Sequence, residues 1–106
     1  MLENKFKTKL IKELEDMFPG CIVFHTDPNE IQGFPDLIIL YENKWAALEG
    51  KKSANEPCQP NQPYYVDLLN SMSFAAFIFP ENKEEVLHEL QQAFFSRRTA
   101  RVSRRK

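Results

Sequence analysis

The sequence is poor in the features that mark secreted, membrane-spanning and repetitive proteins. Its two cysteines, Cys21 and Cys58, show no framework spacing, which indicates reduced thiols rather than a disulfide scaffold. Apolar runs are too short for a membrane span, and the charged N-terminal segment does not resemble a secretory signal. Neither a repeat nor a low-complexity stretch precedes the Arg-rich end. We therefore expect a folded intracellular protein.

Length and charge suggest one acidic domain followed by a basic tail. With 106 residues, 42% of them hydrophobic, the chain can form a single core. Six of its fourteen basic residues lie in 97–106, whereas residues 1–96 hold eight basic and fifteen acidic groups. We expect a domain over 1–95 and a disordered tail over 96–106. Such a tail either meets an anionic partner or only aids solubility, and both readings stay open.

Hydrophobic periodicity and turn residues predict an α/β fold. The pattern favours three helices, the second beginning after an Asn61 cap with Pro63 in its first turn. A long polar loop covers 26–34, and the last strand is apolar enough to be buried on both faces. The expected elements are a helix at 2–18, strands at 21–25, 37–41 and 45–51, a helix from about 62, a strand at 74–79 and a helix at 82–95. The order α-β-β-β-α-β-α predicts a mixed sheet flanked by helices.

Charged residues gather where two of these strands should meet. Asp36 stands just before one strand, and Glu49 and Lys51 lie near the end of the next. Residues two apart on a strand share a face, and a hairpin brings the start of one strand to the end of the other. Two carboxylates and an ammonium group should therefore converge at one edge of the sheet.

Two adjacent carboxylates repel each other, and a hard divalent cation such as Mg²⁺ resolves that conflict. A metal ion there can activate a water and neutralise charge on a phosphate. Lys51 could position the water or stabilise the phosphate. Metal-assisted hydrolysis of a phosphodiester uses all of these groups.

These residues also resemble a known pattern. Pro35-Asp36 followed by Glu49-x-Lys51 resembles the PD-(D/E)xK nuclease motif. The glycine before Pro-Asp, the short strand spacing and the downstream Gln62 resemble its VRR-NUC branch, the virus-type replication–repair nucleases. The resemblance covers about residues 3–95 and implies a restriction-endonuclease-like core. It also implies Mg²⁺ or Mn²⁺ dependence and cleavage of DNA, often branched, flap or junction DNA, in replication, recombination or repair. The expected location then includes the cytoplasm of a virus-infected bacterium.

The resemblance assigns roles to individual residues. Asp36 and Glu49 match the metal ligands, and Lys51 matches the catalytic lysine. The helix carboxylate of the family is matched by Glu3, with Glu13 in reserve. The carbonyl of Gly50 would be a further metal ligand, and Gln62 matches the polar residue near the site.

Gly50 also departs from the pattern, since an apolar side chain usually stands between the Glu and the Lys. A glycine inside a strand loosens packing and backbone order. We therefore expect lower stability or altered strand geometry rather than loss of activity.

Several alternatives remain open. Lys52, Arg97, Arg98 and Arg101 are candidate DNA contacts, although a solvated loop position is the favoured interpretation of Lys52. Acidic residues favour helix N-termini for electrostatic reasons alone, which would also explain Glu3. A homodimer would present two sites to branched DNA. The rival function is a non-catalytic nucleic-acid-binding module that retains the fold.

Overall fold

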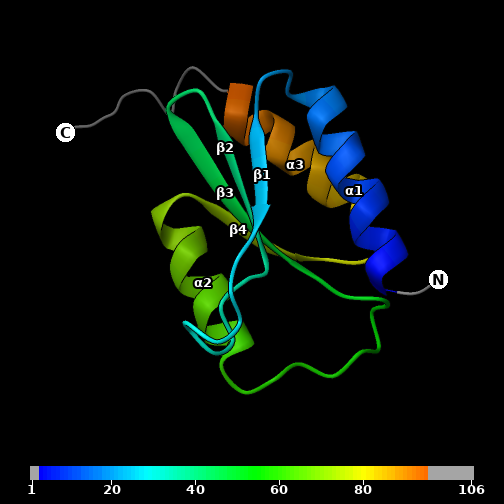
Figure 1. Cartoon of the computed structure of the whole chain (residues 1–106), viewed down its shortest axis with the longest axis vertical. Helices are drawn as coiled ribbons and strands as arrows, with labels where there is room; N and C mark the ends of the chain where they lie inside the picture. The colour runs from blue at the N-terminus through cyan, green and yellow to red at the C-terminus, as the bar shows by residue number, and fades with distance from the viewer. Residues whose placement is uncertain (1–2, 96–106) are drawn as a thin grey trace.

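The computed structural model describes residues 3–95, with side chains from residue 5 onward, and the predicted tail lies outside this range. One mixed four-stranded sheet is flanked by three helices (Figure 1). The elements are α1 (Glu3–Met17), β1 (Ile22–His25), β2 (Leu37–Tyr41), β3 (Lys44–Gly50), α2 (Gln62–Met72), β4 (Phe74–Ile78) and α3 (Lys83–Phe95). The expected order α-β-β-β-α-β-α and the mixed sheet are confirmed.

The sheet has the strand order β1-β2-β3-β4. β1, β2 and β3 run antiparallel to one another, and β4 joins β3 in parallel after the crossover through α2. In the β2–β3 hairpin, Leu37 pairs with Leu48 and Tyr41 with Lys44. A two-residue turn closes the hairpin, with Glu42 at φ 57°. This register places the start of β2 beside the end of β3, as the sequence predicts.

Each face of the sheet carries its own apolar cluster. α1 and α3 cover one face and α2 covers the other (Figure 1). Apolar residues of α1 recur every four positions, which places them on one helical face. The larger cluster includes Phe6, Leu10, Leu14, Leu37, Ile39, Leu48 and Leu90. The smaller one consists of Ala47, Val66, Leu69 and Ala75. The end of β3 is therefore enclosed between two helical layers.

One local expectation was wrong. Asn61 makes no side-chain cap; instead its Nδ2 donates to the Gln32 carbonyl at 3.4 Å. β4 has buried residues on both faces, Ile78 in the larger cluster and Ala75 in the smaller one, although as an edge strand it leaves Phe74 and Phe77 half-buried. Within residues 3–95, every helix is too short or too polar to cross a membrane.

Candidate active site

The Asp36 carboxylate lies at the junction of β2, β3 and α1. Thr26 holds the preceding turn, because its N–H donates to the Asp36 carbonyl at 3.0 Å and its hydroxyl to the Pro35 carbonyl at 2.8 Å. Oδ1 of Asp36 accepts the Gly50 N–H at 2.9 Å, and Oδ2 forms an ion pair with Lys7. Both carboxylate oxygens are therefore engaged, one by the end of β3 and one by α1.

Glu49 and Lys51 are linked through the first residue of α2. Both are nearly buried, at 6% and 4% exposure, on the side of β3 that faces α2. Gln62 donates from Nε2 to Oε2 of Glu49 at 3.1 Å and accepts from Lys51 Nζ at its Oε1 at 2.7 Å. The amide thus holds a buried carboxylate and a buried ammonium in one network.

The orientation of the Gln62 amide follows from its partners. Its Oε1 also accepts the backbone N–H of Gln59 at 2.8 Å. If the amide were flipped, its NH₂ group would face the Lys51 ammonium, and its oxygen would face the Glu49 carboxylate. Both contacts would then be repulsive, so the network admits one orientation.

Asp36 and Glu49 line the same hollow of about 390 Å³. Its other lining residues are Lys7, Thr26, Pro28, Gln32, Gly33, Phe34, Gln59 and Gln62. The convergence of the two carboxylates that the hairpin predicts is present, and their role as metal ligands stays a prediction. Lys51 contacts this lining through Gln62, while its Nζ lies 5.9 Å from the centre of the Phe77 ring.

The remaining sequence candidates lie elsewhere or outside the described part. The reserve carboxylate, Glu13, pairs with Lys83 at 2.9 Å and borders hollows other than the one lined by Asp36. Lys52 is exposed, and its backbone N–H donates to Oε1 of Glu56 at 2.7 Å. The side chain of Glu3 and the arginines at 97, 98 and 101 fall outside the described residues.

Sequence reasoning missed Lys7. It contributes to the hollow, and its ammonium contacts Asp36. The available signal was spacing, because Lys7 stands four residues after Glu3 and so shares its helical face. The structural role of Thr26 was missed as well.

Two carboxylates in one hollow suit a hard divalent cation. Mg²⁺ needs only one or two protein carboxylates and keeps several waters. Oδ2 of Asp36 pairs with the Lys7 ammonium, so a metal ion at this oxygen would compete with Lys7. Within the described residues, no cluster of three His, Cys, Asp or Glu side chains is present. Asp36 and Glu49 are therefore the two carboxylates that fit such a cation. Water or other protein groups would complete its coordination.

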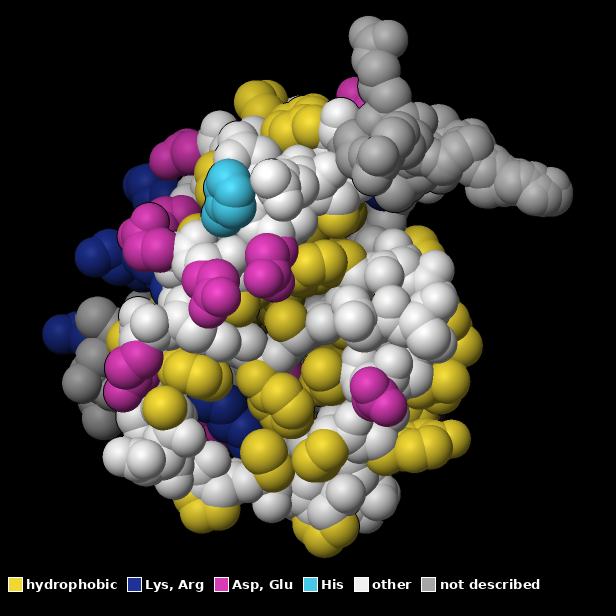
Figure 2. Space-filling model, turned by 180° about the vertical axis from the view of Figure 1, so that it is seen from behind, with side chains coloured by type: hydrophobic (Ala, Val, Ile, Leu, Met, Phe, Trp, Pro, Cys, Tyr) yellow, Lys and Arg dark blue, Asp and Glu magenta, His cyan; other side chains and the backbone are white. Residues whose placement is uncertain are grey.

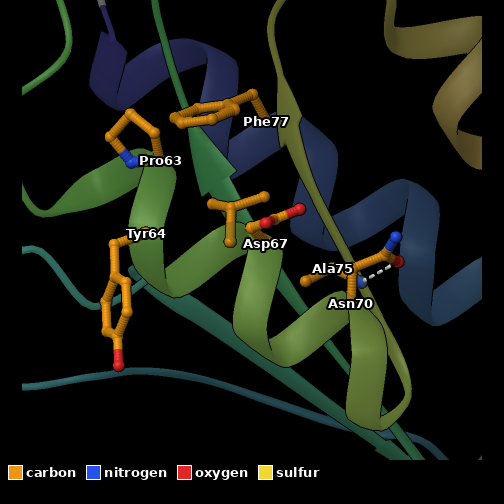
Figure 3. A pocket seen from close by; sticks show the side chains of 7 residues that line it. Pro63, Tyr64, Asp67, Asn70, Ala75 and Phe77 are labelled. Atoms are coloured by element: carbon orange, nitrogen blue, oxygen red, sulfur yellow. Dashed lines mark hydrogen bonds between the residues drawn. The ribbon is translucent and has the colours of Figure 1, made fainter.

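A second hollow, of about 500 Å³, lies between α2 and β4 (Figure 3). Asn70 closes one end, where its Oδ1 accepts the Ala75 N–H at 3.0 Å. Among the residues that line this hollow, Asp67 is the only carboxylate. It lacks the paired carboxylates of the first hollow, which makes it a poorer metal site.

The chain matches no family model, and no curated protein matches it. Among solved structures it is similar to that of Hjc from Archaeoglobus fulgidus, described as a Holliday junction resolvase from an archaeal hyperthermophile. The two share 15% identity over 72% of this chain and 67% of that one, with a TM-score of 0.47. That likeness is too distant to support an argument about activity. The VRR-NUC resemblance therefore rests on the residues of the motif.

Proposed function

We propose that the protein is a metal-dependent DNA endonuclease of the VRR-NUC type within the PD-(D/E)xK group. The observation that carries the proposal is the shared hollow of Asp36 and Glu49, joined through Gln62 to Lys51. A paired carboxylate site next to a buried lysine suits hydrolysis of a phosphodiester better than a purely structural role.

Asp36 and Glu49 would hold Mg²⁺ or Mn²⁺, together with the Gly50 carbonyl and Glu3. A divalent cation supplies an activated water and neutralises charge on the phosphate. Lys51 has three N–H donors, of which Gln62 and the Pro57 carbonyl take two, the latter at 3.3 Å. The third is left for a water or a phosphate oxygen. Gln62 bonds to both Lys51 and Glu49 and so holds the two side chains in place.

DNA would approach the side of the molecule that carries this hollow. Acidic side chains gather over the α1 and α3 part of the view from behind, with basic side chains beside them (Figure 2). Glu13, Asp16 and Glu84 border one hollow there. These carboxylates repel phosphates, so binding would use local basic groups. Lys52 is one such group, and the arginines at 97, 98 and 101 are others. We propose branched, flap or junction DNA as substrate and a homodimer as the acting species.

The test is incubation of the purified protein with branched, flap and plain duplex DNA in Mg²⁺, Mn²⁺ or EDTA. We expect cutting that requires metal and disappears in Asp36→Asn and Lys51→Ala. Asp67→Asn is the matched control, because Asp67 lines the other hollow, and it should cut normally. Metal-dependent cutting that persists in Lys51→Ala would assign the activity to a contaminant or to another site.

One observation favours the alternative of a non-catalytic DNA-binding module: Asp36 already has a cationic partner, Lys7. The same experiment separates the two functions when DNA binding is measured beside cleavage. Folded protein that binds branched DNA but cuts no substrate in either metal would favour the binding module.

A further inference from the structure

The Lys7 side chain runs from α1 across Gly50 to the Asp36 carboxylate. A Cβ placed on Gly50 would lie 2.9 Å from Cε of Lys7 and 3.3 Å from its Cγ. The Lys7 ammonium then pairs with Oδ2 of Asp36, and the side chain is 18% exposed. Lys7 therefore packs along the strand end rather than extending into solvent.

The glycine at position 50 keeps this path open. A separation below 3.0 Å is closer than real Cβ contacts allow, so any other residue here would displace the Lys7 chain. Glycine at position 50 departs from the usual Glu-x-Lys pattern, and the Lys7 side chain of α1 fills the space that this glycine leaves. Lys7 and Gly50 also act on the same group, since the Gly50 N–H donates to Oδ1 of Asp36.

The Lys7 ammonium supplies positive charge beside Asp36, which is what a metal ion at this site is expected to do. Asp36 is 22% exposed and shares its hollow with Glu49, and the Lys7 ammonium supplies positive charge next to it. An ammonium and a divalent cation repel each other, which disfavours close contact of both with one carboxylate oxygen. Metal binding through Oδ2 is therefore favoured when Lys7 moves away.

We propose that Lys7 is a built-in counter-ion that determines the affinity of this site for a divalent cation. In the metal-free protein its ammonium stabilises Asp36, and it withdraws when metal binds. The apparent metal affinity is then the intrinsic affinity multiplied by the fraction of molecules in which Lys7 has left Asp36. The inference rests on the proposed function in one respect, that Asp36 binds metal.

The test compares the protein with Lys7→Met, which retains a flexible apolar chain without the charge. Mn²⁺ binding is measured by calorimetry in the absence of DNA, and thermal unfolding is followed in EDTA. We expect roughly tenfold tighter Mn²⁺ binding by Lys7→Met, within the usual range of coupling between two sites. The melting temperature in EDTA should fall, because Asp36 loses its partner.

Two further variants sharpen the result. Gly50→Ala keeps the ammonium but obstructs its path, so it should also tighten Mn²⁺ binding, by less than Lys7→Met. Lys12→Met removes an exposed charge from the same helix and should change neither measurement. Equal Mn²⁺ affinity in the natural protein and Lys7→Met would overturn the counter-ion role while leaving the metal site intact. Absence of Mn²⁺ binding in all four proteins would overturn the metal site as well.

Discussion

Lys51 donates from Nζ to Oε1 of Gln62 at 2.7 Å, across the gap between β3 and α2. The lysine is buried, and burying an ammonium costs free energy unless its N–H donors have hydrogen-bond partners. The start of α2 therefore positions the lysine that the sequence marks as catalytic. Gln62, the first residue of α2, thus bonds to both buried charged groups of the site.

Gln62→Ala should lower cleavage by about 10–100-fold, the range seen when a group that orients catalytic side chains is removed. The variant frees Lys51 and Glu49 together, so single-turnover cleavage should fall at saturating Mg²⁺. Gln59→Ala is the control, because Gln59 contacts Gln62 through its backbone N–H, which alanine retains. Equal rates in the two variants would show that the side chain of Gln62 is dispensable.

The hairpin and its converging charges could be predicted because they depend on local rules. Apolar strands around a short turn set the pairing of β2 with β3, and the two-residue period then places Asp36 beside Glu49. Neither step requires knowledge of the helices. The mixed sheet follows in the same way from the long connection through α2.

The buried face of α2 could not be predicted with the same success. Tyr64, Leu68 and Leu69 are apolar residues at helical spacing, yet Tyr64 and Leu68 are 62% and 37% exposed. Val66 and Leu69 are buried instead. Apolar residues occur around most of this helix, so its orientation depends on tertiary packing against β3 and β4.

Gly50 shows why the site was only partly predictable. From the sequence it is a weak point in a strand. In the structure the Lys7 side chain fills the space that a Cβ would take. Recognising this requires knowing that α1 crosses the end of β3, which no local pattern reveals.

Removing residues 97–106 should weaken DNA binding and reduce its dependence on salt. The slope of log affinity against log salt becomes shallower by about 0.9 for each phosphate that the protein no longer neutralises. Fluorescence anisotropy over a salt series measures this slope. Replacing only Arg97, Arg98 and Arg101 with glutamine should reproduce part of the change, and an unchanged affinity after the deletion would exclude a DNA-binding tail.

The two candidate helix carboxylates should behave differently. Glu3→Gln is expected to weaken Mn²⁺ binding and slow cleavage, because Glu3 matches the family ligand. Glu13→Gln removes only the ion pair with Lys83, which contributes less than about 1 kcal/mol at a partly exposed position. Its metal affinity should be unchanged. The reverse result would transfer the ligand role to Glu13.

The two thiols should differ in reactivity. Burial, followed by the nearby Glu15 carboxylate, raises the pKa of the Cys21 thiol. Since the thiolate is the reactive form, a raised pKa slows its alkylation at neutral pH. Exposed Cys58 should react first with iodoacetamide, with Cys21 following only as pH rises. Peptide mass spectrometry measures both sites, and Glu15→Gln should accelerate Cys21 alone. Equal rates in the folded protein would contradict the burial of Cys21.

Gly33 should be much less tolerant of alanine than Gly20, although both have positive φ, 88° and 91°. An alanine with positive φ lowers the free energy of unfolding by about 1–2 kcal/mol. Gly20→Ala should lose no more than this, because nothing lies within 4 Å of the added Cβ. At Gly33 the new Cβ would lie 2.4 Å from Cβ of Asn61, so overpacking should bring the loss to about 3 kcal/mol. Urea unfolding measures the difference. Because Asn61 precedes Gln62, Gly33→Ala should also slow cleavage. Equal stability of the two variants would show that the start of α2 can shift to make room for the new Cβ.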